Sequence, residues 1–138
     1  MTRRELRENT FKMLFRMEFH EAGELGAQLR MFEEELRDPL ETKKCITPRE
    51  EAYLANKCNE IFLHVGELDA AINQVSAGWK TSRMSKVDLT IIRLAVYEMR
   101  FEEDIPVAVS INEAVELAKR YGTDDSASFV NGILAKLV

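Results

Sequence analysis

Apolar residues recur every three or four positions along most of the chain, which is the spacing of α-helices that bury one face. No segment alternates between apolar and polar residues with a period of two for long enough to suggest a sheet. The pattern therefore predicts an all-α fold, a single compact domain over residues 1–138 with about seven helices packed around one buried helix.

The central helix is predicted over Ser85–Phe101, where apolar side chains fall on nearly every side. A helix that is apolar all round has to be buried among its neighbours. This one is too short for a bilayer and is interrupted by charges, so the neighbours should be other helices of the protein. Ser85 is the expected N-cap, with Asp88 three residues further on.

The remaining helices are bounded by recognisable start and stop signals. A first helix is predicted over residues 3–20 and a second over residues 25–36, after the glycines at 23 and 26. Thr47 to Glu50 is typical of a capping box and should open a third helix that ends at Gly66. A fourth helix should run from Leu68 and end near Gly78, with Trp79 on its apolar stripe.

Two further helices are predicted at the C-terminal end. Ser110 to Glu113 is a possible capping box, although the helix could begin as early as Pro106, and Gly122 is its natural stop. Thr123, Asp124 or Asp125 should then cap the last helix.

The first predicted helix carries two features besides its buried stripe. Phe11, Phe15 and Phe19 recur every four residues and should line one face. Arg3, Arg4 and Arg7 are three and four positions apart, which gathers three guanidinium groups on one flank. A solvated first turn would also explain these arginines.

Charge is distributed unevenly. The whole chain has a net charge of −5 and a pI of about 5.2, which argues against nonspecific nucleic-acid binding. Residues 1–20 nevertheless carry five basic and three acidic groups, whereas residues 21–70 carry six basic and twelve acidic groups. A basic end on an acidic body allows a local site for a polyanion.

The residues do not suggest an enzyme or a metal centre. Cys45 and Cys58 stand alone, and His20 and His64 are isolated, so no catalytic, metal or cofactor site is predicted. The unpaired cysteines and the lack of a signal-peptide pattern at the N-terminus favour a cytoplasmic protein.

Three blocks in register resemble the NusB family. They are the arginine-rich start of the first helix, the central stretch Ile91–Met99, and a C-terminal signature made of Ile111–Lys119, Tyr121–Gly122 and Phe129–Leu134. Residues 21–50 add nothing to the match, which otherwise covers almost the whole chain.

The resemblance implies a bacterial transcription antitermination factor with an all-helical fold. Such proteins pair with a small-subunit ribosomal protein that acts as NusE. The pair binds the single-stranded boxA element of nascent ribosomal transcripts and helps RNA polymerase resist termination. No cofactor and no chemical reaction are implied.

The resemblance also assigns roles to individual residues. RNA contacts are implied for a basic and aromatic set, which comprises Arg3, Arg4, Arg7, Lys119, Arg120, Tyr121, Asp125 and Phe129. Core packing is the alternative for Phe129, and an ordinary N-cap is the alternative for Asp125. Asp88 and Phe15 match positions that face NusE, although tyrosine is usual at the second and Phe15 lacks the hydroxyl. Asp88 could equally serve only at the helix cap.

Three other interpretations stay open at this point. The same helical domain is found at the N-terminus of ribosomal RNA cytosine methyltransferases, so the chain could be a fragment or free-standing relative of that RNA-binding module. It could be a protein–protein scaffold with an incidentally basic helix. The apolar stripe beside Phe11 and Phe15 would also permit a homodimer.

Overall fold

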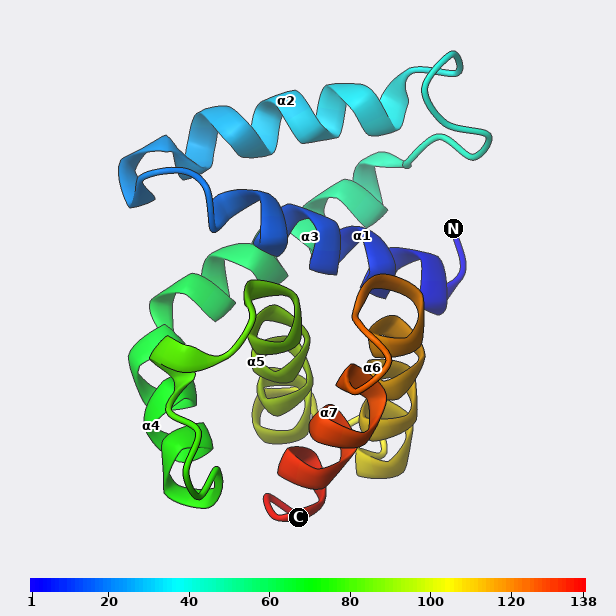
Figure 1. Cartoon of the computed structure of the whole chain (residues 1–138). Helices are drawn as coiled ribbons and strands as arrows, with labels where there is room; N and C mark the ends of the chain where they lie inside the picture. The colour runs from blue at the N-terminus through cyan, green and yellow to red at the C-terminus, as the bar shows by residue number, and fades with distance from the viewer. The chain divides into compact units, whose positions relative to one another are not determined.

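The computed structural model describes residues 1–138, and every regular element in it is helical (Figure 1). The all-α prediction is therefore confirmed. Short 3-10 turns cover Ala22–Glu24 and Thr81–Arg83. The seven α-helices are α1 (Arg3–Met17), α2 (Leu25–Arg37), α3 (Pro48–Leu63), α4 (Val65–Val75), α5 (Lys86–Phe101), α6 (Val107–Tyr121) and α7 (Ser126–Ala135).

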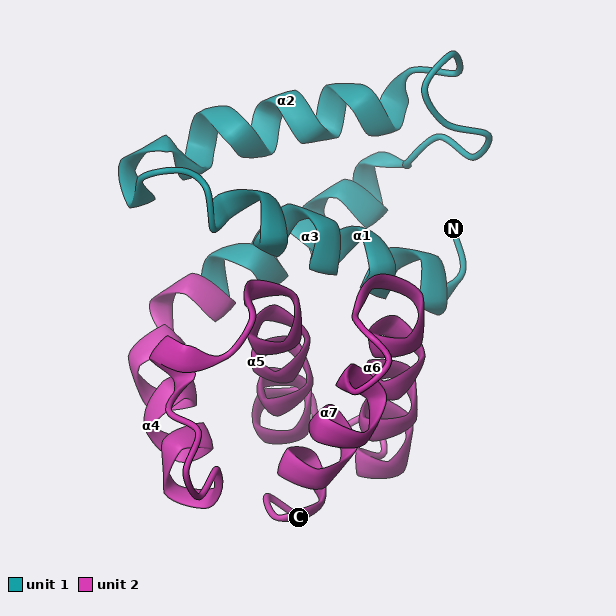
Figure 2. Cartoon of the chain, viewed as in Figure 1, with its two compact units in different colours: residues 1–60 teal, residues 61–138 magenta.

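The chain divides into two compact units, coloured separately in Figure 2. Unit 1 comprises Met1–Glu60 and unit 2 comprises Ile61–Val138, so the boundary falls within α3. The expectation of a single domain over residues 1–138 stays a prediction.

Unit 1 is built from α1, α2 and most of α3. Thr2 and Glu5 form a reciprocal capping box at the start of α1, which satisfies two amides that a helix end otherwise leaves open. α1 packs on α2, where the Arg16 Nε donates to Gln28 at 2.9 Å and the guanidinium lies 5.9 Å from the Phe32 ring centroid.

The start of α3 confirms the predicted capping box. The Thr47 hydroxyl accepts from the Glu50 amide at 3.2 Å, and the Glu50 carboxylate accepts from the Thr47 amide at 2.9 Å. Arg37 at the end of α2 donates to Glu51 in α3. This hydrogen bond lowers the pKa of Glu51 and helps to join the two helices of unit 1.

Unit 2 is organised around α5, as the sequence predicts. Residues 89–92 and 94–98 are all buried, and α5 lies between α4 on one side and α6 on the other, with α7 also against it (Figure 1). The Ser85 hydroxyl accepts from the Asp88 amide at 3.1 Å, which confirms the N-cap. Arg93 holds α4 to α5 through two hydrogen bonds to Asp69, at 2.8 and 2.7 Å.

One predicted boundary is wrong, and at another the structure selects the earlier of two predicted starts. α3 ends at Leu63, one residue before the break at His64, and Gly66 lies inside α4 rather than stopping α3. α6 begins directly after Pro106, whose fixed φ of −58° already suits the start of a helix. Ser110 is therefore not a cap: its hydroxyl donates to the buried carboxylate of Glu98 in α5 at 2.9 Å.

The end of α4 also differs from the prediction. α4 stops at Val75, and Gly78 adopts a φ of +82°, a conformation that glycine reaches without strain. Trp79 consequently leaves the helical stripe and is 54% exposed instead of packing inward.

The two cysteines differ sharply in environment. Cys45 is exposed in the loop between α2 and α3, whereas Cys58 is fully buried and its burial raises the pKa of the thiol to about 12. We expect a thiol-reactive dye at neutral pH to label one cysteine in the native protein and two in denaturant, measured by mass spectrometry. Rapid native labelling of Cys58 would contradict the described packing of α3, and a Cys45→Ser variant supplies the control.

Candidate nucleic-acid interface

The basic flank of α1 is only partly accessible. Arg3 and Arg4 are exposed in the first turn, directly after the Thr2 cap, whereas Arg7 is only 9% exposed. The positive end of the helix dipole adds to the two exposed guanidinium groups. An anion could therefore reach Arg3 and Arg4 at this end of unit 1, while Arg7 contributes to packing.

The corner between α6 and α7 is held by a close backbone approach. The Ser126 hydroxyl accepts from the Thr123 amide at 2.9 Å. A Cβ atom on Gly122 would lie 2.3 Å from the Ser126 Oγ and 2.8 Å from the Ala118 carbonyl oxygen. The backbone of Gly122 is extended, with a φ of −93°, so the requirement for glycine is steric.

This corner carries most of the predicted RNA-binding residues. Lys119 and Arg120 are exposed in the last turn of α6, and the Arg120 guanidinium lies 5.7 Å from the ring centroid of the half-buried Tyr121. Phe129, on the second turn of α7, is also half-buried. Cations and partly accessible rings thus occur together at one end of unit 2.

Asp125 does not cap α7 with its side chain, so the capping alternative is wrong for its carboxylate. The amide of Thr123 is satisfied by Ser126 instead. Asp125 remains exposed at the start of the helix. Its carboxylate is therefore available to accept a hydrogen bond from a bound molecule.

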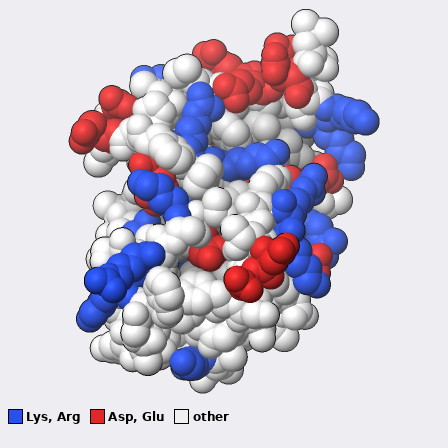
Figure 3. All heavy atoms as spheres, viewed as in Figure 1, with Lys and Arg blue, Asp and Glu red and all other residues white.

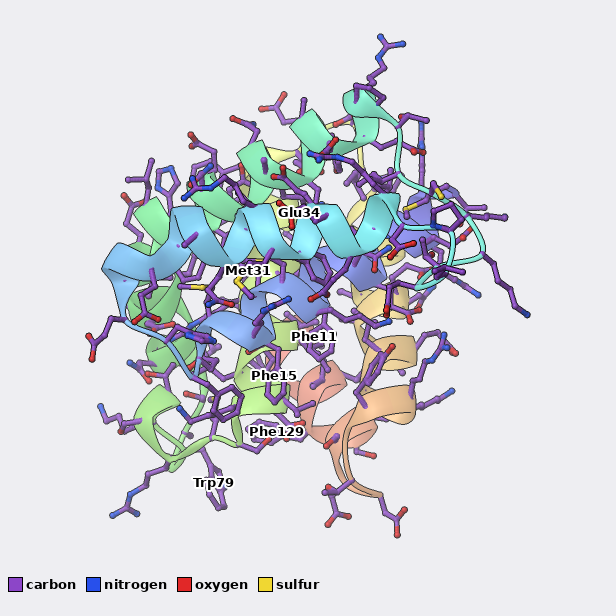
Figure 4. The ribbon with its side chains drawn as sticks, turned by 90° about the horizontal axis from the view of Figure 1, so that it is seen from above. Phe11, Phe15, Met31, Glu34, Trp79 and Phe129 are labelled. Atoms are coloured by element: carbon purple, nitrogen blue, oxygen red, sulfur yellow. The ribbon has the colours of Figure 1, made fainter.

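An aromatic residue that the sequence placed in the core joins this surface. The exposed Trp79 ring meets Phe129 edge to face, with centroids 6.4 Å apart, and Figure 4 shows the two side chains next to each other. A cavity of about 220 Å³ opens beside the pair. The signal that could have found Trp79 is its position between Gly78, a turn residue, and the basic segment that starts at Lys80.

The two predicted partner-binding residues belong to different units. In unit 1, Phe15 is half-buried, stacked on Phe11 at 6.0 Å and edge to face with Phe19 at 5.2 Å (Figure 4). In unit 2, the Asp88 Oδ1 is buried and has no hydrogen-bond partner, so Asp88 does not complete a reciprocal capping box. The Asp88 side chain as a whole is half-buried, so only its accessible part could contact a partner.

Other kinds of site are not indicated by the coordinates. No group of three or more His, Cys, Asp or Glu side chains could hold a metal ion. None of the helices has the length and apolar character needed to cross a membrane.

Comparison with known proteins identifies the family. A family model described as the NusB family matches residues 4–138. This chain belongs to the NusB family. The transcription antitermination protein NusB of Agathobacter rectalis is 58% identical over 99% of this chain and 98% of its own length. That of Lachnoclostridium phytofermentans is 53% identical over 100% and 99%.

Solved structures of the NusB family have the same fold. A Thermotoga maritima NusB structure superimposes with a TM-score of 0.82 at 34% identity and covers 99% of this chain and 90% of that one. A NusB structure described as a complex of antitermination factors NusB and NusE with double-stranded RNA gives a TM-score of 0.80 at 23% identity, covering 98% and 94%. The function of this NusB-family chain is transcription antitermination. These relatives do not support the alternative that the chain is related to a methyltransferase domain.

Proposed function

We propose that this chain binds boxA RNA of nascent transcripts as a heterodimer with the ribosomal protein NusE, and so helps RNA polymerase resist termination. The observation that carries the proposal is the last turn of α6 in a NusB-family chain, where the exposed Lys119 and Arg120 accompany the half-buried Tyr121 ring and the Arg120 guanidinium lies over that ring. The half-buried Phe129 ring of α7 adds a second aromatic surface. No chemical reaction or cofactor is part of this role, which is that of an adaptor working in the cytoplasm.

The chemistry of the corner suits an unpaired RNA strand. Single-stranded RNA is recognised by rings on which splayed bases stack and by cations that contact its phosphates. Tyr121 and Phe129 supply the rings, and Lys119 and Arg120 supply the cations. The Asp125 carboxylate could accept a hydrogen bond from a base edge, since it is exposed and does not cap the helix.

The exposed arginines of α1 form the second part of the proposed RNA contact. Guanidinium groups bind phosphates bidentately and also stack on bases. Arg3 and Arg4 can make such contacts because their side chains are exposed. Arg7 is mostly buried, so we assign it a structural role in addition to any RNA contact.

A direct test compares three RNAs with the purified chain, with and without NusE. We expect boxA RNA to bind weakly to the chain alone and more tightly to the heterodimer, with both affinities falling as salt rises because phosphates contribute. Fluorescence anisotropy with labelled boxA, scrambled and duplex RNAs measures this. Equal retention of boxA and scrambled RNA by the heterodimer at physiological salt would overturn the proposal.

The partner contact is tested at Asp88. We expect Asp88→Ala to weaken NusE binding about tenfold, because this position matches one that faces NusE in the family and the half-buried carboxylate would lose a charge-assisted contact with the partner. Isothermal titration calorimetry gives the affinity. Ser85 still caps α5 through the backbone amide of residue 88, so helicity should be retained. Glu103→Ala, at an exposed acid in the loop after α5, is the matched control.

A further inference from the structure

We propose that the cavity beside Trp79 and Phe129 in unit 2 is a pocket for one unpaired RNA base, and that Trp79 is a residue of the RNA-binding surface. The proposal rests on the proposed RNA-binding function and adds to it a specific recognition site. It also gives a role to Trp79 and to the basic segment after it.

The pocket is formed by two segments that the fold brings together. The turn after α4 supplies Ser76, Ala77 and Trp79, and α7 supplies Phe129 and Gly132, followed by Lys136 directly after the helix. Lys136 joins the two walls, since its Nζ donates to the Val75 carbonyl at 3.4 Å. Trp79 and Phe129 stand at the rim with their rings nearly perpendicular, at 77°.

The size of the cavity selects its occupant. At about 220 Å³ it is smaller than the roughly 300–1,000 Å³ of pockets that hold drug-sized ligands. The cavity therefore has room for one planar ring system such as a base. Trp79 is 54% exposed, which leaves much of its indole accessible for stacking.

Ser76 forms part of the cavity wall in the turn after α4. The residue is 5% exposed and its Oγ is itself buried, so the hydroxyl is not available to a ligand. The rings of Trp79 and Phe129 are therefore the groups that can recognise a base in this pocket, by stacking.

Gly132 keeps the pocket open. Close approach of a neighbouring helix does not explain this glycine, because no heavy atom lies within 4 Å of a Cβ built at this position. Glycine inside a helix is less favourable than alanine by about 1 kcal/mol. A residue that weakens α7 without a packing reason is explained if a side chain there would obstruct the cavity it lines.

The charges around the pocket favour nucleic acid over a basic protein segment. Between Asp69 and Asp88 the chain has no acidic residue, and the segment after Trp79 carries the exposed Lys80, Arg83 and Lys86. After Asp125 the chain is also free of acids and adds Lys136. Figure 3 shows Lys and Arg side chains, together with a smaller group of Asp and Glu, around a largely uncharged surface. Aromatic rings edged by cations are what single-stranded nucleic acids require.

Trp79 is the only tryptophan in the chain, so its fluorescence reports on this pocket directly. We expect boxA RNA to quench it on titration into the full-length protein. Trp79→Ala should lower RNA affinity about five- to a hundredfold, the range expected for loss of one stacked base, and Trp79→Phe should restore most of it. Leu63→Ala, at an exposed apolar position away from the cavity, is the control and should bind as the wild type does.

Gly132→Leu is the sharper variant because it should obstruct the pocket without harming the fold. We expect a melting temperature at or above that of the wild type together with at least fivefold weaker RNA binding, and Gly132→Ala should fall in between. If the wild type binds boxA specifically and Gly132→Leu binds it equally well, the base pocket is wrong and the proposed function stands. Weaker NusE binding with unchanged RNA affinity would also overturn the pocket by making it a protein site. If the wild type fails to bind RNA with or without NusE, the proposed function itself fails.

Discussion

Replacing Arg3 and Arg4 together with glutamine is expected to weaken boxA binding by more than tenfold while the circular dichroism spectrum stays helical. Both side chains are exposed in the first turn of α1, and the Thr2–Glu5 capping box that holds this turn does not depend on their side chains. If each arginine contacts one phosphate, the slope of log affinity against log salt should fall by about one to two. Anisotropy titrations at several salt concentrations measure both effects.

The matched control removes the same number of positive charges from other positions in unit 1. Arg30 and Arg49 are exposed, and Arg30→Gln with Arg49→Gln should leave boxA affinity within about twofold of the wild type. An equal loss in the control would show that the overall charge, rather than the α1 end, drives binding. Arg7 is left in place because it is only 9% exposed and its removal would also disturb packing.

Gly122→Ala is expected to lower the free energy of unfolding by about 1–3 kcal/mol, the usual cost of forcing extra atoms into a packed site. Its Cβ would lie 2.3 Å from the Ser126 Oγ, which a rotamer change could relieve, but also 2.8 Å from the Ala118 carbonyl oxygen, which is fixed in the last turn of α6. The α6–α7 corner would have to open. RNA affinity should fall with it, since Lys119 to Tyr121 lie at this corner.

Thermal melts of Gly122→Ala and Gly132→Ala provide an internal comparison. The first should melt several degrees below the wild type and the second at or above it, because only Gly122 is approached closely by other atoms. Equal melting temperatures for the two variants would show that the corner is looser than described.

Much of the fold could be predicted because local signals agree with the tertiary structure. The all-round apolar character of α5 required burial, and the capping box at Thr47 marked the start of α3. Ser110 shows the limit. Its pattern with Glu113 imitates a cap, but Pro106 had already started α6, and only the packing of α6 on α5 reveals that the hydroxyl serves Glu98.

The candidate site could be predicted from the sequence only in part, because its geometry depends on a turn conformation and on contacts between segments that are far apart in the sequence. Helical spacing placed Trp79 in the core because the positive φ of Gly78, which ends the turn, cannot be read from periodicity. The cavity depends on Ser76 and Gly132, residues 56 positions apart in the sequence, so no local pattern joins them. For Asp125 the sequence predicts either an RNA contact or a helix cap. The hydrogen bonds at the start of α7 exclude the side-chain cap, and the RNA contact stays a prediction.

The most direct test of the RNA-binding account is to map contacts by photo-crosslinking boxA RNA to the NusE heterodimer and identifying the modified peptides by mass spectrometry. We expect crosslinks in the peptide that carries Arg3 and Arg4, in the α6–α7 corner around Tyr121 and Phe129, and at Trp79, all absent with scrambled RNA. Crosslinks confined to other segments, or the same pattern with scrambled RNA, would contradict it.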